Sequence, residues 1–178
     1  MGLGKLLRPD AFSGYRGDIQ AGAGIAMKTD ELKKQIAAAR SRYYRLVLLV
    51  GSAATGKTEI LVQTARDEGY PYINLNLALS QKLLEYPARM RALRLPRIVE
   101  TIIGETGKNT VLLDNTEILF DPVLQQDPLR LLQQVSRNRT IVAAWNGKFE
   151  GGALVYAEPD HPEYRKYYEV DALICPLE

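Results

Sequence analysis

One short segment of the sequence has the residue types and spacing that bind the phosphates of a nucleotide. Residues 51–58 read GSAATGKT and match the Walker A pattern G-x-x-x-x-G-K-[ST]. Glycine permits the backbone angles that turn successive N–H groups toward one anion. The lysine supplies a point charge for the β- and γ-phosphates, and the hydroxyl that follows it is a ligand for Mg²⁺. The segment therefore predicts a phosphate-binding loop (P-loop).

The ligand expected here is ATP, with Mg²⁺ as its counter-ion. Lys57 is also a candidate catalytic group, because its positive charge would contact the γ-phosphate, which is the group that would be transferred. Thr58 is expected to bind the metal. The residues expected to contact the nucleotide are Gly51, Ser52, Ala53, Ala54, Thr55, Gly56, Lys57, Thr58 and Glu59.

A carboxylate and two further polar residues are candidates for the other side of the site. A P-loop needs a second metal ligand at the end of a neighbouring buried strand, and Asp114 ends the apolar run TVLLD. Glu117 is the candidate for polarising the attacking water, or it caps a turn. Asn115 stands where a glutamate often follows the aspartate, and it could orient water without accepting a proton. Asn146 is a candidate sensor of the γ-phosphate, or it forms a turn with Gly147.

The elements needed to position these residues are visible in the pattern of apolar residues. The run 45–50, RLVLLV, is typical of a central parallel strand buried on both faces. A helix over 57–67 follows the loop, so the P-loop has the required strand before it and helix after it. Further strands are expected at 71–75, 110–114, 140–145, 153–157 and 172–175. Helices are expected at 29–42, at 80–105 with interruptions near Pro87 and Pro96, and from Pro122 through 129–135.

Alternating strands and helices predict an α/β fold, a P-loop NTPase three-layer sandwich with about five mainly parallel strands and helices on both faces. The strand 140–145 should lie between 45–50 and 110–114, which brings Asn146 beside the phosphate loop. Residues 1–28 are rich in glycine and are expected to be a flexible arm. The nucleotide-binding domain is expected over 29–178, with Thr29 capping its first helix.

Two groups of arginines are candidates for a binding role, and each has a solvated surface as its alternative. Arg137 and Arg139 precede a strand and are candidate arginine fingers, in the same chain or toward a neighbouring subunit; loop arginines are otherwise only solvated. Arg91, Arg94 and Arg97 recur every three residues after Arg89, so on a helix they form a stripe for phosphate, DNA or an acidic partner, or a solvated face.

Composition limits the possible classes of protein. Lys and Arg total 23 against 21 Asp and Glu, a net charge of +2 that does not by itself indicate nucleic-acid binding. One Cys and one His exclude an intrachain disulfide and make a His/Cys metal site untenable. No apolar run approaches the ~18 residues of a membrane span, and no apolar signal core begins the sequence. A cytoplasmic protein without membrane contact is expected.

Beyond the P-loop, the segments PYINLNLALSQKLLEY, VLLDNTEILFDP, SRNRTIVAAWNG and YAEPDHPEYR occur in an order that resembles the BrxF family of bacteriophage-exclusion (BREX) defence systems. The resemblance covers about residues 30–178. It implies an ATP-binding component of a multi-protein antiphage complex, with other BREX proteins as partners. The N-terminal arm is not part of the resemblance.

Three functions stay open at this point. The first is an ATPase or ATP-driven switch, supported by Asp114, Glu117 and Asn146. The second is a scaffold that binds ATP with little hydrolysis, supported by Asn115. The third is a small-molecule kinase, which would need an arginine-bearing lid that the sequence does not offer. Self-association into an oligomer and contact with DNA are possible in any of them.

Overall fold

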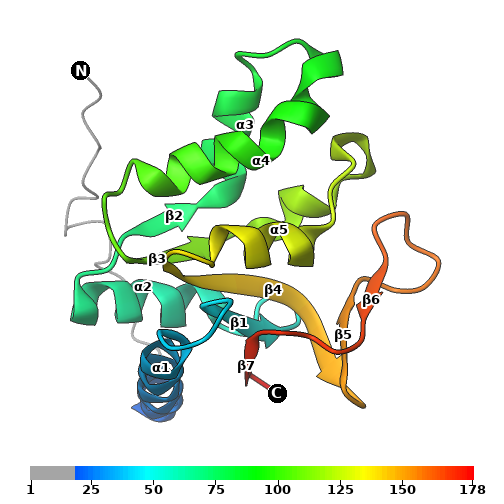
Figure 1. Ribbon diagram of the computed structural model, residues 1–178. Coiled ribbons are helices and arrows are strands. Elements are labelled where there is room, and N and C mark those ends of the chain that lie inside the picture. The colour runs from blue at the N-terminus through cyan, green and yellow to red at the C-terminus, as the bar shows by residue number, and fades with distance from the viewer. Residues whose placement is uncertain (1–18) are drawn as a thin grey trace.

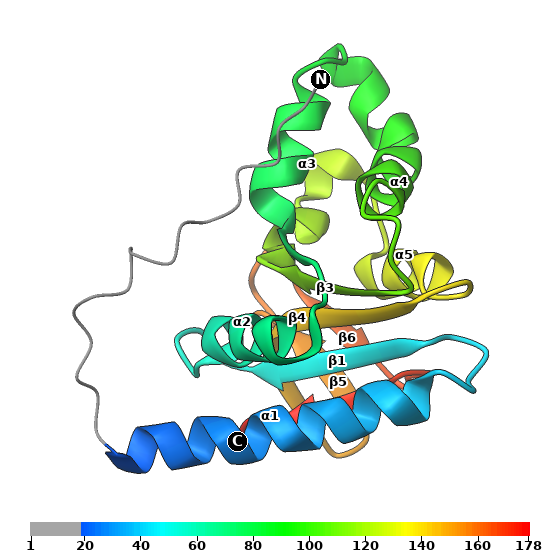
Figure 2. The same ribbon diagram turned by 90° about the vertical axis from the view of Figure 1, so that its left-hand side faces the viewer.

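The computed structural model describes the backbone of residues 19–178 and the side chains from residue 22 on. A mostly parallel sheet lies between two layers of helices (Figures 1 and 2). Five strands run parallel in the order β2–β3–β4–β1–β7, and two more extend the sheet from β4. The strands are β1 (Leu46–Gly51), β2 (Tyr72–Asn74), β3 (Thr110–Asp114), β4 (Thr140–Glu150), β5 (Ala153–Tyr156), β6 (Arg165–Tyr167) and β7 (Leu173–Pro176). The predicted fold class and the predicted place of β4 between β1 and β3 are both confirmed.

Alternate residues of the central strands enter two separate hydrophobic cores. In β1, Leu46, Leu48 and Val50 pack with the helices on one face, and Val47 and Leu49 pack with those on the other. Side chains of successive strand residues point to opposite faces, so a strand covered on both sides must be apolar throughout. This is why β1 and β3 appear in the sequence as unbroken apolar runs.

The helices divide between the two faces of the sheet. The helices α1 and α2 contribute to one core, and α3, α4 and α5 contribute to the other (Figure 2). Their bounds are α1 (Ile19–Ala39), α2 (Lys57–Glu68), α3 (Leu75–Leu83), α4 (Ala88–Gly104) and α5 (Pro128–Val135). Within residues 19–178, every helix falls short of the length or the hydrophobicity that crossing a membrane requires.

The first helix begins at Ile19, so the expected arm over 1–28 is wrong for residues 19–28. The part of that arm before Ile19 lies outside the described residues. Thr29 is not a cap, because it is inside the helix and its hydroxyl donates to the carbonyl of Ile25 at 2.8 Å. Glycine disfavours a helix locally, but Ile25 packs against the α1–α2 core and Lys28 Nζ donates to the Pro176 carbonyl at 3.0 Å. Tertiary contacts therefore override local propensity here.

The helical region expected at 80–105 is two helices with different bounds. Asn74 caps α3 by accepting a hydrogen bond from the backbone N–H of Leu77 at 3.1 Å, so this helix begins earlier than expected. Pro87 does separate α3 from α4. Pro96, by contrast, lies inside α4 without ending it, where the buried neighbours Leu95 and Val99 hold the helix against the core.

The strand expected to end at Trp145 continues to Glu150. The Asn146–Gly147 turn is therefore wrong, because Gly147 pairs with Tyr156 in the antiparallel extension formed by β4 and β5. Trp145 Nε1 donates to the Val155 carbonyl at 3.1 Å across this pair. A Cβ on Gly147 would lie 1.9 Å from the same carbonyl oxygen. Glycine is required at this position because a backbone group and an indole both approach it.

Substitution of Gly147 by alanine is expected to destabilise the protein by about 1–3 kcal/mol, because the added methyl overlaps the Val155 carbonyl. The matched control is Gly22→Ala, where an added Cβ has no atom within 4 Å. That change should stabilise α1 by about 0.5–1 kcal/mol, since alanine is the better helix former. Denaturant unfolding measures both. Equal stabilities of the two variants would contradict the close approach at Gly147.

Candidate nucleotide-binding site

The P-loop has the conformation that its sequence predicts. It leaves the end of β1 at Gly51 and enters α2 at Lys57. A Cβ on Gly51 would lie 2.6 Å from Thr55 Oγ1, and Gly56 has a φ of 91°, so both glycines are required. Thr55 Oγ1 donates to the Ser52 carbonyl at 2.8 Å and closes the loop on itself. The loop therefore curls around the N-terminus of α2, where helix N–H groups favour an anion.

Lys57 is a buried cation held inside this loop. Its side chain is only 6% exposed, and Nζ donates to the carbonyls of Gly51, at 2.8 Å, and Ser52. Burial lowers the pKa of Lys57, and the carboxylates of Glu117 and Asp114 oppose that shift. A buried ammonium group forms stronger hydrogen bonds with an anion such as a phosphate than with neutral carbonyls.

Thr58 and Asp114 meet across the site, as the sequence predicts. Thr58 Oγ1 donates to Asp114 Oδ2 at 2.6 Å, and the backbone N–H of Asn115 donates to Oδ1 at 2.9 Å. Sequence reasoning missed Tyr72, whose hydroxyl donates to Asp114 Oδ2 at 2.7 Å. Burial, and then the hydrogen bond to Asp114, raise the pKa of Tyr72. The sequence signal was a tyrosine in a strand of the sheet, since a buried phenol needs a partner.

The candidate for polarising water, Glu117, and the candidate γ-phosphate sensor, Asn146, contact each other. Asn146 lies opposite Gly51 in the pairing of β4 with β1, and its Nδ2 donates to Glu117 Oε1. Glu117 is on a 3-10 helix over Thr116–Phe120, directly after Asn115, whose φ is 52°. The hydroxyl of Thr116 donates to the Ala144 carbonyl at 2.5 Å and fixes this short helix to β4. The fold therefore brings Glu117 and Asn146 together in the cavity beside the P-loop.

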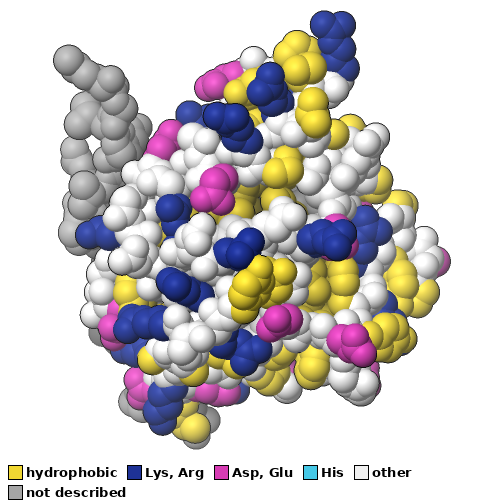
Figure 3. Space-filling model, viewed as in Figure 1, with side chains coloured by type: hydrophobic (Ala, Val, Ile, Leu, Met, Phe, Trp, Pro, Cys, Tyr) yellow, Lys and Arg dark blue, Asp and Glu magenta, His cyan; other side chains and the backbone are white. Residues whose placement is uncertain are grey.

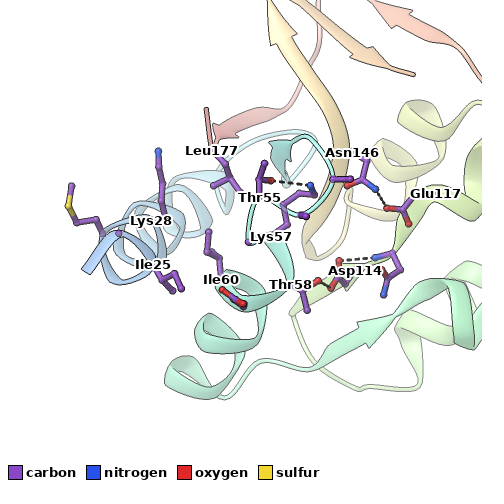
Figure 4. A pocket seen from close by; sticks show the side chains of 17 residues that line it. Ile25, Lys28, Thr55, Lys57, Thr58, Ile60, Asp114, Glu117, Asn146 and Leu177 are labelled. Carbon is purple, nitrogen blue, oxygen red and sulfur yellow. Dashed lines mark hydrogen bonds between the residues drawn. The ribbon is translucent and has the colours of Figure 1, made fainter. Parts of the chain in front are cut away.

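These residues line one cavity of about 820 Å³ (Figure 4). Two segments that the sequence did not indicate form its other side. They are α1, through Gly24, Ile25, Met27 and Lys28, and the tail after β7, through Leu177. The predicted residues that line the cavity are Ala53, Ala54, Thr55, Gly56, Lys57, Thr58, Glu59, Asp114, Asn115, Glu117 and Asn146. Gly51 and Ser52 are not part of this lining, and their carbonyls accept hydrogen bonds from Lys57 Nζ.

The candidate arginines lie elsewhere. Arg137 and Arg139 precede β4, so they lie at the amino-terminal ends of the strands, opposite the P-loop. Arg137 stacks over the ring of Tyr43, 4.6 Å from its centroid. An arginine finger from these residues in the same chain is therefore excluded. Arg91 Nε donates to the carbonyls of Leu83 and Tyr86 and ties α4 to the end of α3. Lys and Arg side chains gather over α3 and α4 at the top of Figure 3.

The oxygen atoms in the cavity fit Mg²⁺. Thr58 and Asp114 offer a hydroxyl and a carboxylate, which are hard donors. Among the described residues, no group of three or more His, Cys, Asp or Glu could hold a metal on its own. A protein that supplies one or two oxygens is the usual partner of Mg²⁺ bound to phosphates, because this ion keeps several waters.

Comparison with known proteins adds little. No protein-family model and no curated protein matches the sequence. A solved structure of C. elegans PCH-2 matches with a TM-score of 0.35 and 19% identity, over 70% of this chain and 35% of that one. The chain therefore spans about a third of the length of that protein, and a likeness of this size does not establish a family.

Tyr72→Phe is expected to lower the free energy of unfolding by about 1 kcal/mol, since it removes one hydrogen bond to Asp114 and keeps the ring. Tyr43→Phe is the control, because Tyr43 is 62% exposed and its described contacts are made by its ring. Urea unfolding compares the two. If both variants are as stable as the wild type, the Tyr72–Asp114 bond does not hold the carboxylate in place.

Proposed function

We propose that this protein binds ATP with Mg²⁺ and hydrolyses it as an ATPase or ATP-driven switch. The observation that supports it best is that Lys57, Thr58 and Asp114 line one cavity at the carboxyl ends of the strands. Glu117 and Asn146 line the same cavity. Phosphoryl transfer depends on positioning and electrostatics, which these residues are placed to provide.

In the proposed complex the phosphates lie along the loop 51–58 and the N-terminus of α2. Lys57 exchanges its loop carbonyls for phosphate oxygens, which are stronger acceptors because they are charged. Thr58 and Asp114 hold Mg²⁺, which neutralises charge on the β- and γ-phosphates when bound. Tyr72 would hold the Asp114 carboxylate in position for the metal through its 2.7 Å hydrogen bond.

The base and ribose of the nucleotide are proposed to lie between α1 and the C-terminal tail. The cavity continues there beyond the loop and is lined by the apolar side chains of Ile25, Met27 and Leu177. The backbone N–H of Leu177 donates to the Val50 carbonyl at 2.8 Å, so the tail is fixed beside the loop. Apolar walls of this kind bind a planar base by contact area and not by reading its hydrogen-bonding edge.

For hydrolysis, Glu117 is proposed as the general base. A water oxygen attacks the γ-phosphorus, the bond to the β-phosphate oxygen breaks to release ADP, and Glu117 accepts the proton of the water. Asn146 Nδ2 donates to Oε1 of this carboxylate, which leaves Oε2 for the proton. Asn146 is thus proposed to orient the base and to sense the γ-phosphate.

A second candidate function is an ATP-binding scaffold with little hydrolysis. Two observations favour it: Asn115 occupies the place next to Asp114 where a glutamate is common, and no arginine is among the described residues that line the cavity. Without an arginine, charge developing in the transition state is less well stabilised. A partner subunit would then have to supply it.

The biological setting is part of the same proposal and rests on the sequence resemblance to the BrxF family. We propose that the protein acts in the cytoplasm within a BREX antiphage complex, with other BREX proteins as partners. Self-association into an oligomer would bring an arginine of one subunit to the site of another. The exposed Arg89, Arg94 and Arg97 of α4 are the surface proposed for DNA or an acidic partner.

Lys57→Ala should weaken ATP binding by about tenfold to over a hundredfold, because a charge-assisted hydrogen bond to phosphate is lost. Inorganic tripolyphosphate should lose a similar factor, since Lys57 acts on phosphates alone. Lys148→Ala, at a surface ion pair, is the control and should bind both as the wild type does. Calorimetry that finds unchanged affinities in the Lys57 variant would refute the phosphate cradle.

Glu117→Gln should bind ATP normally and turn it over about 10²-fold more slowly, because the amide keeps the shape but cannot accept a proton. Asp114→Ala should instead damage both Mg²⁺-dependent binding and turnover. Phosphate release is measured where the wild type is active, with partner proteins present if needed. Undiminished turnover in Glu117→Gln would move the role to Asn115 or a neighbouring subunit. A wild type that never hydrolyses ATP would favour the scaffold.

A further inference from the structure

A second cavity lies at the opposite end of the sheet from the P-loop. Its volume is about 600 Å³, and it opens where the parallel strands begin. Arg45 precedes β1, Thr110 is the first residue of β3, and Thr140 is the first residue of β4. The two cavities are therefore separated by the length of the central strands, and neither ATP nor the proposed catalytic residues use this one.

The side chains that line this cavity carry an excess of positive charge. Arg40, Arg45 and Lys108 face it from the loop after α1 and from the loop before β3. The one acid in the lining is Glu68. Its carboxylate lies 3.7 Å from Nζ of Lys33, a residue that does not line the cavity. Within the described residues none of the three cations forms an ion pair, so their charge is left for a ligand.

Arg45 also has a buried donor that nothing satisfies. Its Nε is buried without a hydrogen-bond partner among the described residues, and Nη1 of Arg139, just before β4, is in the same condition. The backbone of Arg45 is fixed by two sheet-end hydrogen bonds, to the Ser136 carbonyl and from the Ile141 N–H, each 2.8 Å. A buried donor without a partner costs stability, and in Arg45 it belongs to a side chain that also lines the cavity.

An alternative account is that these cations only balance the ends of helices. The helices α1, α2 and α4 end near the amino-terminal ends of the strands, and their last carbonyls carry partial negative charge. No described hydrogen bond joins the three side chains to those carbonyls, however. Arg40 Nη2 donates at 3.1 Å to the hydroxyl of Tyr70, which itself lines the cavity. Arg40 is thus directed to a hydroxyl of the cavity lining, and Arg45 and Lys108 belong to the same lining.

We propose that this cavity is a second anion site, which binds the phosphate group of a small phosphorylated ligand through Arg40, Arg45 and Lys108. A phosphate accepts several hydrogen bonds at once, which suits two guanidinium groups, an ammonium and the neighbouring hydroxyls of Tyr70, Thr110 and Thr140. The volume is that of a small-molecule pocket. Because the site lies at the amino ends of the strands that carry the P-loop and Asp114, its ligand would bind independently of ATP.

The test uses the full chain carrying Lys57→Ala, in which phosphate binding at the P-loop is weakened. Inorganic pyrophosphate is titrated by calorimetry at constant ionic strength, with sodium chloride as the matched salt. We expect binding to persist in Lys57→Ala and to fall about tenfold or more when Arg45→Gln or Lys108→Gln is added. Arg89→Gln, an exposed arginine on α4, is the control and should change nothing. Lys108 is exposed, so its loss leaves the fold intact.

Two comparisons complete the test. A 5′-phosphorylated oligonucleotide and its 5′-hydroxyl counterpart should both fail to compete with pyrophosphate; competition by the phosphorylated form alone would mean that the site takes a nucleic-acid end and would overturn the assignment to a small ligand. ATP affinity of the Arg45→Gln single variant should equal that of the wild type, which separates this site from the nucleotide site. Loss of all pyrophosphate binding in Lys57→Ala, or its survival in both double variants, would overturn the proposal.

Discussion

The hydrogen bond from Thr58 to Asp114 joins the two halves of the proposed nucleotide site, and the rest of the arrangement depends on it. Thr58 follows β1 and Asp114 ends β3, yet these strands are not neighbours, because β4 lies between them. The bond therefore forms only if three parallel strands have the right register. The pairing of Gly51 with Asn146 fixes that register at the edge where the loop begins.

Inserting β4 between β1 and β3 also gives Asn146 and Glu117 their contact. The strand delivers Asn146 beside the loop, and the hydroxyl of Thr116 anchors the 3-10 helix that carries Glu117 to the same strand. Beyond Asn146, β4 continues into the antiparallel extension, which is held at Gly147 and Trp145. One strand thus serves as a core element at its start and as a support of the site at its end.

Charge is distributed unevenly along the sheet. At the carboxyl ends of the strands a buried lysine is surrounded by carboxylates and by the N-terminus of α2, and together they favour phosphates with a divalent cation. At the amino ends, Arg40, Arg45 and Lys108, which form no ion pair within the described residues, line a second cavity close to the C-terminal end of α2. A parallel sheet with antiparallel helices imposes this polarity, because all helix dipoles that return across the sheet point the same way.

The sequence alone determined the P-loop, the two buried strands beside it and the identity of the residues at their ends. Those features depend on local rules: glycine where the backbone must turn sharply, and continuous apolar runs where a strand is covered on both faces. It also placed β4 correctly, and so brought Asn146 to the loop. Tertiary structure alone decided that α1 begins at Ile19, that Pro96 stays inside α4 and that β4 passes through Asn146–Gly147. In each of these places packing against distant residues outweighs the local propensity of Gly, Pro or Asn. The sequence did not indicate the contribution of Tyr72 and Leu177 to the site, because Tyr72 is in β2 and Leu177 follows β7, and their contacts exist only once the sheet has formed.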